Sequence, residues 1–368
     1  MTKSNPFKFG SVVDEPFFTD RNNELQKVKN VLQSPNHLIL ISPRRYGKTS
    51  LILKAVKALH RSYLFIDLQL VTDTADLARQ LLKHIYRLFP FEKVKQYIKH
   101  FRVIPSLNIN PLTNEIDISL QPAFSADFLL EDVLNTIEKL GTPDKRIIVI
   151  IDEFQDINHI EKGLDKKFRA IVQYHKNVNY AFLGSIESMM REIFEKKKSP
   201  FYHFGQIMPL NKIPEDDLLL YLNERLTEVC SDKEAGLQIL NITKAHPYYT
   251  QQLAFTVWDI CRADKKISNP VKCATDYLIQ IHDIDYERLW NNQTQTDKKV
   301  LIALANNESN LLTGTVLNNY GIPAASTAYS SLKKLMNKGL VLKSDTGYQL
   351  DDPFFAGWIT MKRNSIFQ

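Results

Sequence analysis

The chain has 368 residues, of which 44% are hydrophobic and 24% are charged. This composition is typical of a soluble globular protein and excludes wholesale disorder, and the length predicts two or three domains. Lys and Arg outnumber Asp and Glu by 47 to 41, an excess of +6 that permits contact with nucleic acid without arguing for it.

The cysteine content predicts the compartment. The 3 cysteines, Cys230, Cys261 and Cys273, form no C-x-x-C pair, which argues against a zinc site. A sparse, odd set is typical of buried thiols in a reducing compartment. The N-terminus has no apolar segment of a signal peptide, and no apolar run approaches the roughly 18 residues of a membrane span. We therefore expect a cytoplasmic protein that has no membrane partner.

Four short apolar runs in the first half of the chain predict buried strands. They are residues 36–42, 63–70, 146–151 and 178–183. Stretches with helical periodicity separate them, for example the face formed by Leu51, Ala55 and Leu59. Strands that alternate with helices predict right-handed βαβ units and a parallel sheet.

Residues 103–109 and 115–120 interrupt this alternation. Both segments alternate apolar and polar residues around Asn110–Asn114, which predicts an inserted hairpin at about residues 102–120. A surface elaboration of the sheet and a partner-binding arm are both compatible with this pattern.

The strand signal fades after Pro209. Pro214 and the three acidic residues after it are typical of a helix start, and helical periodicity continues to about Tyr286. We expect an α/β domain over residues 1–211 and an all-helical lid over residues 212–290.

A different pattern begins near Gln295. Three helices are predicted, at residues 297–305, 314–320 and 326–337, and a tight hairpin turns at residues 345–347. Three helices followed by a β-hairpin are the outline of a winged helix-turn-helix, which we place at residues 291–368.

The segment Ser-Pro-Arg-Arg-Tyr-Gly-Lys-Thr at residues 42–49 follows the first predicted strand and precedes a helix. It matches the phosphate-loop pattern G-x-x-x-x-G-K-[ST], except that Ser42 replaces the first glycine. Gly47 allows close backbone approach to phosphate, and Lys48 supplies charge to the β and γ phosphates. The Thr49 hydroxyl would ligate Mg²⁺.

This segment therefore predicts a site for ATP and Mg²⁺. The predicted nucleotide-binding residues are Ser42, Pro43, Arg44, Arg45, Tyr46, Gly47, Lys48, Thr49 and Ser50. For Arg44 and Arg45, extra phosphate contacts and solvent exposure are both compatible with the sequence.

Two acids follow the third apolar run. Asp152 ends the run and would emerge beside Thr49 as a second Mg²⁺ ligand, because ligands bind at the carboxyl edge of a parallel sheet. Glu153 would orient or deprotonate the water that attacks the γ phosphate. Ser185 ends the next run, and its hydroxyl would either sense the γ phosphate or cap the helix at residues 186–196. The predicted catalytic residues are Lys48, Glu153 and Ser185.

In combination, these motifs resemble the archaeal-type ATPase family, a prokaryotic branch of the AAA-like, STAND-related P-loop ATPases. The segments that carry the resemblance are Ser42–Thr49, Ile151–Asp156, Phe182–Ser185, Phe18–Leu25, His246–Tyr249, Leu335–Gly339 and Tyr348–Trp358. The resemblance implies an ASCE-type three-layer α/β domain with a parallel sheet, followed by a helical lid and a winged helix that act as one nucleotide switch.

The resemblance also implies binding residues outside the phosphate loop. It implies adenine contacts from the segment around Arg21 and a lid contact from Pro247. Relatives often carry an arginine soon after a Pro-aromatic-Tyr segment, and Pro200–Phe204 lacks one. We therefore assign no arginine finger to Arg169 or Arg191, and expect hydrolysis that is slow or depends on a partner.

Two classes of function remain open. The first is an ATPase that hydrolyses ATP to ADP and phosphate as a conformational switch. The second is a non-hydrolysing adaptor that binds DNA or protein through the winged helix, or a mobile-element or replication accessory protein. A DNA-reading helix would offer the polar residues Ser326, Tyr329, Ser330, Lys333, Lys334 and Asn337, with Leu332 and Leu335 facing the core. The alternative is that the winged helix is a packing module that locks the ATPase closed or binds another protein. The sequence does not decide the oligomeric state.

Overall fold

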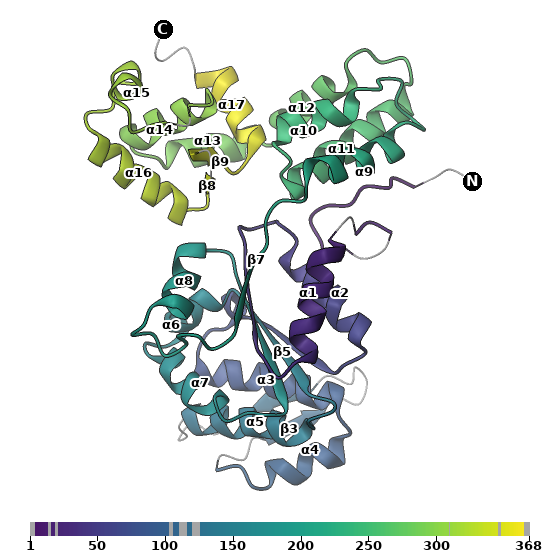
Figure 1. The fold of residues 1–368 in the computed structure, drawn as a ribbon, viewed down its shortest axis with the longest axis vertical. Helices are drawn as coiled ribbons and strands as arrows, with labels where there is room; N and C mark the ends of the chain where they lie inside the picture. The colour runs from purple at the N-terminus through teal and green to yellow at the C-terminus, as the bar shows by residue number, and fades with distance from the viewer. Residues whose placement is uncertain are drawn as a thin grey trace. The chain divides into compact units, whose positions relative to one another are not determined.

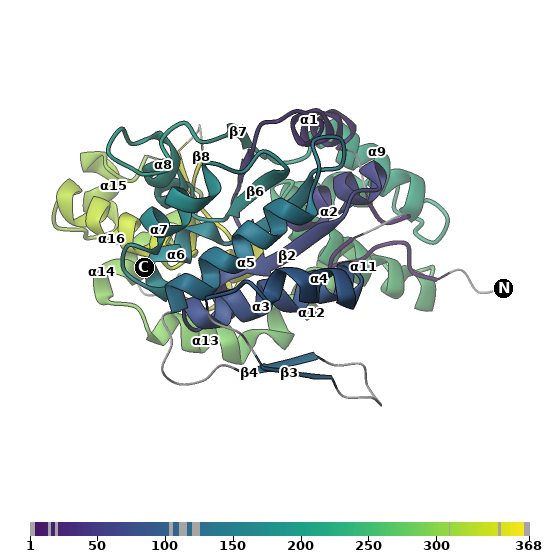
Figure 2. The same ribbon diagram turned by 90° about the horizontal axis from the view of Figure 1, so that it is seen from below.

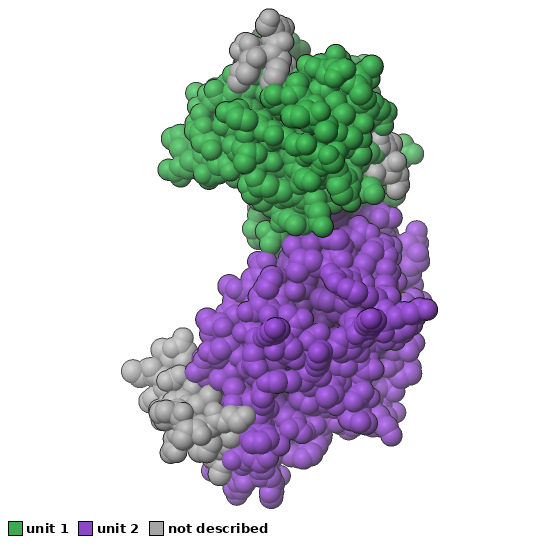
Figure 3. Space-filling view, turned by 90° about the vertical axis from the view of Figure 1, so that its left-hand side faces the viewer, with its two compact units in different colours: residues 1–20, 44–47, 212–368 green, residues 21–43, 48–211 purple. Residues whose placement is uncertain are grey.

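The computed structural model describes residues 4–13, 16–18, 21–102, 106–109, 116–119, 126–308, 310–344 and 347–363. The chain divides into two compact units, which Figure 3 distinguishes by colour. The sheet unit comprises residues 21–43 and 48–211. The helical unit comprises residues 1–20, 44–47 and 212–368.

Five parallel strands form the centre of the sheet unit, in the order β2-β5-β6-β1-β7 (Figure 1). The strands are β1 (Leu38–Ile41), β2 (Tyr63–Asp67), β5 (Ile147–Asp152), β6 (Val178–Gly184) and β7 (Gln206–Pro209). The predicted parallel sheet is confirmed. The sequence did not predict β7, because this edge strand is short and Met208 is its one buried residue.

Strand β6 lies between β1 and β5 and sets the register of the sheet centre. Ile41 pairs with Gly184, and Ile151 pairs with Phe182. The carboxyl ends of these three strands therefore meet at one edge of the sheet, where parallel α/β sheets bind ligands.

Eight α-helices accompany this sheet in the described ranges of the unit. They are α1 (Asn22–Gln33), α2 (Lys48–Leu59), α3 (Thr74–Leu88), α4 (Phe91–Ile98), α5 (Ala126–Leu140), α6 (Ile157–Ile160), α7 (Leu164–Val172) and α8 (Glu187–Glu195). Figure 1 shows α1 and α2 on one side of the sheet and α3, α5 and α7 on the other. Burial of the strands on both faces explains why they read as continuous apolar runs.

A separate two-stranded ribbon lies within the predicted hairpin. Strand β3 (Ser106–Ile109) pairs antiparallel with β4 (Ile116–Ser119), as Figure 2 shows. The rest of the predicted arms and the turn at Asn110–Asn114 lie outside the described residues.

The helical unit contains the second half of the chain. Its elements are α9 (Glu215–Leu226), α10 (Ala235–Thr243), α11 (Pro247–Ala263), α12 (Pro270–Ile281), α13 (Asp283–Asn291), α14 (Gln295–Ala305), α15 (Gly314–Asn319), α16 (Ala325–Asn337), β8 (Val341–Ser344), β9 (Gly347–Leu350) and α17 (Pro353–Arg363). Helices α14 to α16 and the β8–β9 hairpin form the predicted winged helix, whose turn at residues 345–346 lies outside the described residues. The sequence did not predict α17 as a helix.

One hydrophobic core runs through the whole helical unit. It extends from Phe7 through α9 to α16 and ends at Ile359 in α17. Trp358 is fully buried in this core, and its ring nitrogen donates a hydrogen bond of 2.6 Å to Asp283 Oδ1. The lid and the winged helix therefore pack as one body, and the boundary near residue 291 stays a prediction.

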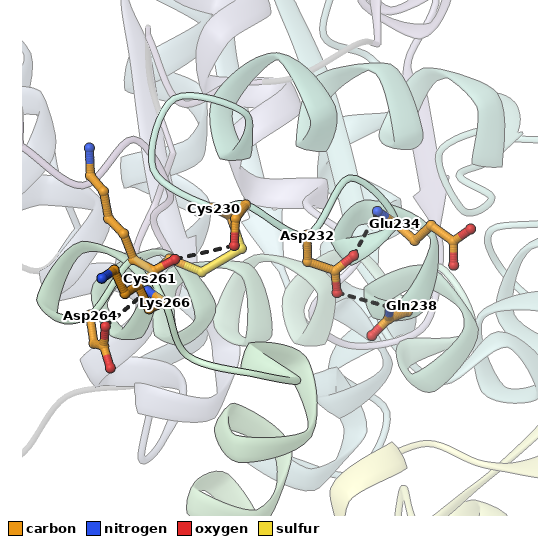
Figure 4. The surroundings of a disulfide bond; sticks show 9 residues. Cys230, Asp232, Glu234, Gln238, Cys261, Asp264 and Lys266 are labelled. Carbon is orange, nitrogen blue, oxygen red and sulfur yellow. Dashed lines mark hydrogen bonds between the residues drawn. A yellow bond between two sulfur atoms is a disulfide. The ribbon is translucent and has the colours of Figure 1, made fainter.

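A disulfide joins the segment between α9 and α10 to α11 (Figure 4). Cys230, just after α9, is bonded to Cys261 in α11, with a Cα–Cα distance of 5.1 Å. The expectation of free buried thiols is wrong for this pair, because packing brings together side chains that lie 31 residues apart in sequence. Such a separation gives no sequence signal of its own. Cys273 is free and exposed.

No helix in the described ranges combines the length and the apolar character that a membrane span requires.

Candidate functional site

The loop between β1 and α2 is tightly curved. Ser42 is buried, and its backbone N–H donates to the carbonyl of Gly184 at 3.2 Å. Arg45 and Gly47 adopt left-handed backbone conformations, with φ of 64° and 90°. Gly47 meets this requirement without strain, because it has no Cβ.

Lys48 is the first residue of α2 and is almost fully buried. Its ammonium group donates to the carbonyl of Ser42 at 3.0 Å and to the carbonyl of Pro43 at 3.3 Å. The first turn of α2 contains no acidic side chain, so the helix itself does not neutralise the positive end of its dipole. A buried ammonium group and a helix N-terminus together favour an anion at this loop.

A hydroxyl and a carboxylate meet beside this ammonium group. Thr49 Oγ1 donates to Asp152 Oδ2 at 3.0 Å, and Asp152 Oδ1 accepts from the backbone N–H of Glu153 at 2.9 Å. Burial raises the pKa of Asp152, although the charge of Lys48 and the Thr49 hydrogen bond act in the opposite direction. Hydroxyl and carboxylate oxygens are hard ligands of the kind that Mg²⁺ prefers, so the donor set fits this ion.

Glu153 leaves the end of β5 in a left-handed conformation, with φ of 52° and ψ of 45°. Such a backbone is uncommon for a residue other than glycine and is often found at functional sites. The fully buried Phe154 follows it and packs against Phe182 with a ring-centroid distance of 4.5 Å. This anchor fixes the direction of the turn that carries Glu153.

The carboxylate of Glu153 has two side-chain donors. Ser185 Oγ donates to Glu153 Oε2 at 2.5 Å, and Gln155 Nε2 donates to the same oxygen at 2.5 Å. The alternative reading of Ser185 as a helix cap is wrong, because the N-cap residue of α8 is Ile186. The sequence analysis assigned no role to Gln155, although this residue lies within the Ile151–Asp156 segment that carries the family resemblance.

Residues 44–47, at the centre of the loop between β1 and α2, belong to the helical unit. Arg45 donates to the hydroxyl of Tyr249 at 2.8 Å, and its guanidinium lies 4.6 Å from the ring centroid of Tyr248. The ring of Tyr46 lies 5.0 Å from that of His246. Arg44 is exposed. Both arginines left open by the sequence are therefore exposed, and Arg45 in addition contacts two tyrosines.

Three other predicted residues lie near the ends of helices. Arg21 is buried at the start of α1 and forms an ion pair of 3.1 Å with Glu24. Ser50 is buried in the first turn of α2, and Pro247 is the first residue of α11. The nucleotide contacts of these residues stay predictions.

Arg169 and Arg191, the two arginines considered for an arginine finger, both have local partners. Arg169 donates to the carbonyl of Pro200 at 3.1 Å. Arg191 forms ion pairs of 2.8 and 2.7 Å with Glu187 and Glu195 on its own helix. Both arginines are held by local partners within the sheet unit.

Two family models match the chain. The model of an ATPase domain predominantly from Archaea matches residues 18–234, which is more than half of the chain. The chain belongs to this ATPase family. The model of a probable winged helix domain matches residues 284–361 of this archaeal-type ATPase. The predicted family resemblance is therefore confirmed.

Solved structures show the same fold. The archaeal-type ATPase resembles the Walker-type ATPase PABY2304 of Pyrococcus abyssi with a TM-score of 0.67 and 19% identity, over 94% of this chain and 97% of that one. It resembles the ADP form of the ORC2 protein of Aeropyrum pernix with a TM-score of 0.50 and 14% identity, over 99% and 98% of the two chains. No curated protein matches the sequence.

Proposed function

We propose that this archaeal-type ATPase binds ATP with Mg²⁺ and hydrolyses it to ADP and phosphate as a conformational switch coupled to the winged helix. The observation that carries the proposal is the 3.0 Å contact between Thr49 and Asp152 at the end of β5. It joins the start of α2, which carries Lys48, to an acid at the end of β5, where P-loop enzymes place an aspartate that helps to hold Mg²⁺.

Each residue has a distinct role in this proposal. Backbone N–H groups of the loop and the ammonium group of Lys48 hold the phosphates. Thr49 and Asp152 would hold Mg²⁺, which when bound neutralises charge on the phosphate oxygens. Glu153 orients a water molecule and accepts its proton as the water oxygen bonds to the γ phosphorus. The bond between that phosphorus and the β–γ bridging oxygen breaks, and ADP leaves.

The rate of this reaction depends on charge at the γ phosphate. An arginine finger contributes about 10³ to 10⁵ in the turnover of other P-loop enzymes. Arg169 and Arg191 are occupied by local partners, so slow basal hydrolysis is expected, with acceleration by a partner that supplies a cation.

Phosphate release with and without Mg²⁺ tests the proposal. Wild-type protein should release phosphate only with Mg²⁺, and Glu153→Gln should reduce turnover by about a hundredfold or more while it still binds ATP. Glu192→Gln, at an exposed acid paired with Lys196 on α8, is the matched control and should leave turnover unchanged. Turnover by Glu153→Gln at the wild-type rate would refute the assigned role.

A second candidate function is DNA binding through the winged helix. The outer face of α16 carries polar side chains, and Tyr329 in its middle is 54% exposed. Leu332 and Leu335 are fully buried on the opposite face, as the sequence predicts. This arrangement supports the proposal that α16 is a recognition helix. Lys334 is less suited to DNA contact, because it forms an ion pair of 2.6 Å with the buried Asp297.

Fluorescence anisotropy with labelled double-stranded DNA tests the second candidate. Binding that weakens steeply with salt would support it, because phosphate contacts release counterions. Binding that is absent at low salt, in the presence and absence of ATP, would leave the winged helix a module for protein contact.

A further inference from the structure

A buried amide lies next to the proposed catalytic acid. Gln155 belongs to the short 3₁₀ helix at Phe154–Asp156 and is 3% exposed. Its Nε2 donates to Glu153 Oε2 at 2.5 Å. Burial of an amide costs free energy unless hydrogen bonds compensate, so this contact is the one that accounts for a glutamine here.

Both side-chain donors reach the same carboxylate oxygen. Ser185 Oγ, at the end of β6, also donates to Glu153 Oε2. In the described part of the chain, no hydrogen bond falls on the other oxygen, Oε1. The carboxylate is therefore held from one side by two elements, and its second oxygen keeps both lone pairs available for a proton.

The end of β6 leaves room for this amide. A Cβ on Gly184 would lie 2.8 Å from Gln155 Oε1 and 2.3 Å from the side chain of Met190. A larger residue at position 184 would therefore displace the side chain of Met190 or the amide of Gln155. Among the described residues, Gln155 Oε1 is buried and has no hydrogen-bond partner, so the contact with Glu153 is the hydrogen bond that compensates for burial of this amide.

The backbone of Glu153 makes such support necessary. Its left-handed conformation begins a sharp turn, and the side chain leaves the sheet edge with no helix or strand of its own to fix it. A side chain in that position has several rotamers available, and only some direct an oxygen at a bound water. Two charge-assisted hydrogen bonds to Oε2 select one of them.

We propose that Gln155 is a positioning residue for the hydrolysis reaction. Together with Ser185 it fixes Glu153 through Oε2, which leaves Oε1 to take the proton of the attacking water. This inference rests on the proposed ATP hydrolysis and assigns that reaction a residue outside the phosphate loop and the acidic pair.

The substitution Gln155→Leu tests the inference, since leucine has a similar size and no donor. The turnover number should fall about tenfold to a hundredfold, because misplaced catalytic groups cost rates of this order. KM and the affinity for a fluorescent ATP analogue should stay at wild-type values. Gln173→Leu, at an exposed glutamine on the same unit, is the matched control.

A kinetic double-mutant cycle separates positioning from a general structural effect. In the Glu153→Ala background, where single-turnover rates are measured, Gln155→Leu should cause no further loss, because its only target is gone. If the rate loss of the double variant equals the product of the two single losses, Gln155 acts elsewhere and the inference is overturned. Wild-type turnover by Gln155→Leu would overturn it as well.

Failure of the proposed hydrolysis is distinguishable from failure of this inference. If wild-type protein releases no phosphate under any condition, the hydrolysis proposal fails, and the role of Gln155 in it fails with it. Melting temperatures of wild type, Glu153→Ala, Gln155→Leu and the double variant then decide whether the hydrogen bond between the two side chains exists. Coupled shifts would retain the contact between Gln155 and Glu153, and additive shifts would refute it.

Discussion

The hydroxyl of Thr49 donates a hydrogen bond of 3.0 Å to Oδ2 of Asp152, a residue 103 positions later in the chain. The contact links the first turn of α2 to the last residue of β5. It exists because β1 and β5 lie on either side of β6 in the parallel sheet. The elements that follow β1 and β5 therefore meet at the same edge of the sheet. The two oxygens define where a divalent cation would bind.

Asp152→Asn should remove the dependence of ATP affinity on Mg²⁺. Asparagine keeps the shape and can accept from Thr49, but it lacks the charge that attracts the cation. We expect an increase of about tenfold or more in the Kd of a fluorescent ATP analogue with Mg²⁺, and little change with EDTA. Asp156→Asn is the control. An equal Mg²⁺ effect in Asp152→Asn and wild type would exclude the carboxylate as a ligand.

Acid should destabilise the helical unit through Asp297. Burial opposes the charged form, but hydrogen bonds from Lys334, Ser331 and Thr294 prevail and lower the pKa of Asp297 to about 2. A folded-state pKa below the unfolded value of about 3.9 gives stability that is present above pH 4 and is lost as the pH falls toward 2.

Denaturation measured between pH 2 and 7 checks this expectation. Asp297→Asn should be less stable than wild type at neutral pH, with the difference shrinking toward pH 2. Asp285→Asn, at an exposed acid on α13, should follow the wild-type pH profile. A constant difference between Asp297→Asn and wild type across the range would contradict the role of the Asp297 charge.

Two adjacent lysines on α16 should behave differently in DNA binding. Lys333 is exposed, so Lys333→Ala should weaken binding and reduce the salt dependence by about one counterion without loss of stability. Lys334 is paired with Asp297, so Lys334→Ala should lower the melting temperature instead. Anisotropy titrations at several salt concentrations and thermal melts measure the two effects. Equal effects of both substitutions on DNA affinity would argue against this interface.

Reduction should destabilise the helical unit. The Cys230–Cys261 bond closes a loop across 31 residues, and such a bond typically stabilises by about 2 to 4 kcal/mol. Dithiothreitol should therefore lower the melting temperature of wild type. Cys261→Ser should have the lower melting temperature without reductant and respond to it no further, whereas Cys273→Ser should behave as wild type. A melting temperature of wild type that is insensitive to reductant would contradict the bond.

The sequence predicted the parts of the fold that depend on local patterns. Continuous apolar runs predicted the central strands, and Leu332 and Leu335 predicted the buried face of α16. Edge strand β7 was missed, because partial exposure removes the apolar run. Helix α17 was missed as well, because its aromatic residues pack against distant helices rather than following one clear face.

In the candidate site, too, the sequence predicted only the residues that a local pattern marks. The phosphate-loop pattern placed Lys48 and Thr49, and the end of an apolar run placed Asp152. The bonds from Gln155 and Ser185 to Glu153 were not predictable, because they depend on the register of β5 and β6 and on side-chain rotamers. The contact of Arg45 with Tyr249 joins residues 204 positions apart and has no local signal.

Isothermal titration calorimetry with MgATP tests the central claim most directly. Wild-type protein should bind one ATP, and Lys48→Ala should bind at least about a hundredfold more weakly, because it loses the buried ammonium group that faces the phosphates. Lys57→Ala, at an exposed lysine in the last turn of α2, should bind as wild type does. Equal affinity of wild type and Lys48→Ala for MgATP would contradict the assignment of the nucleotide site.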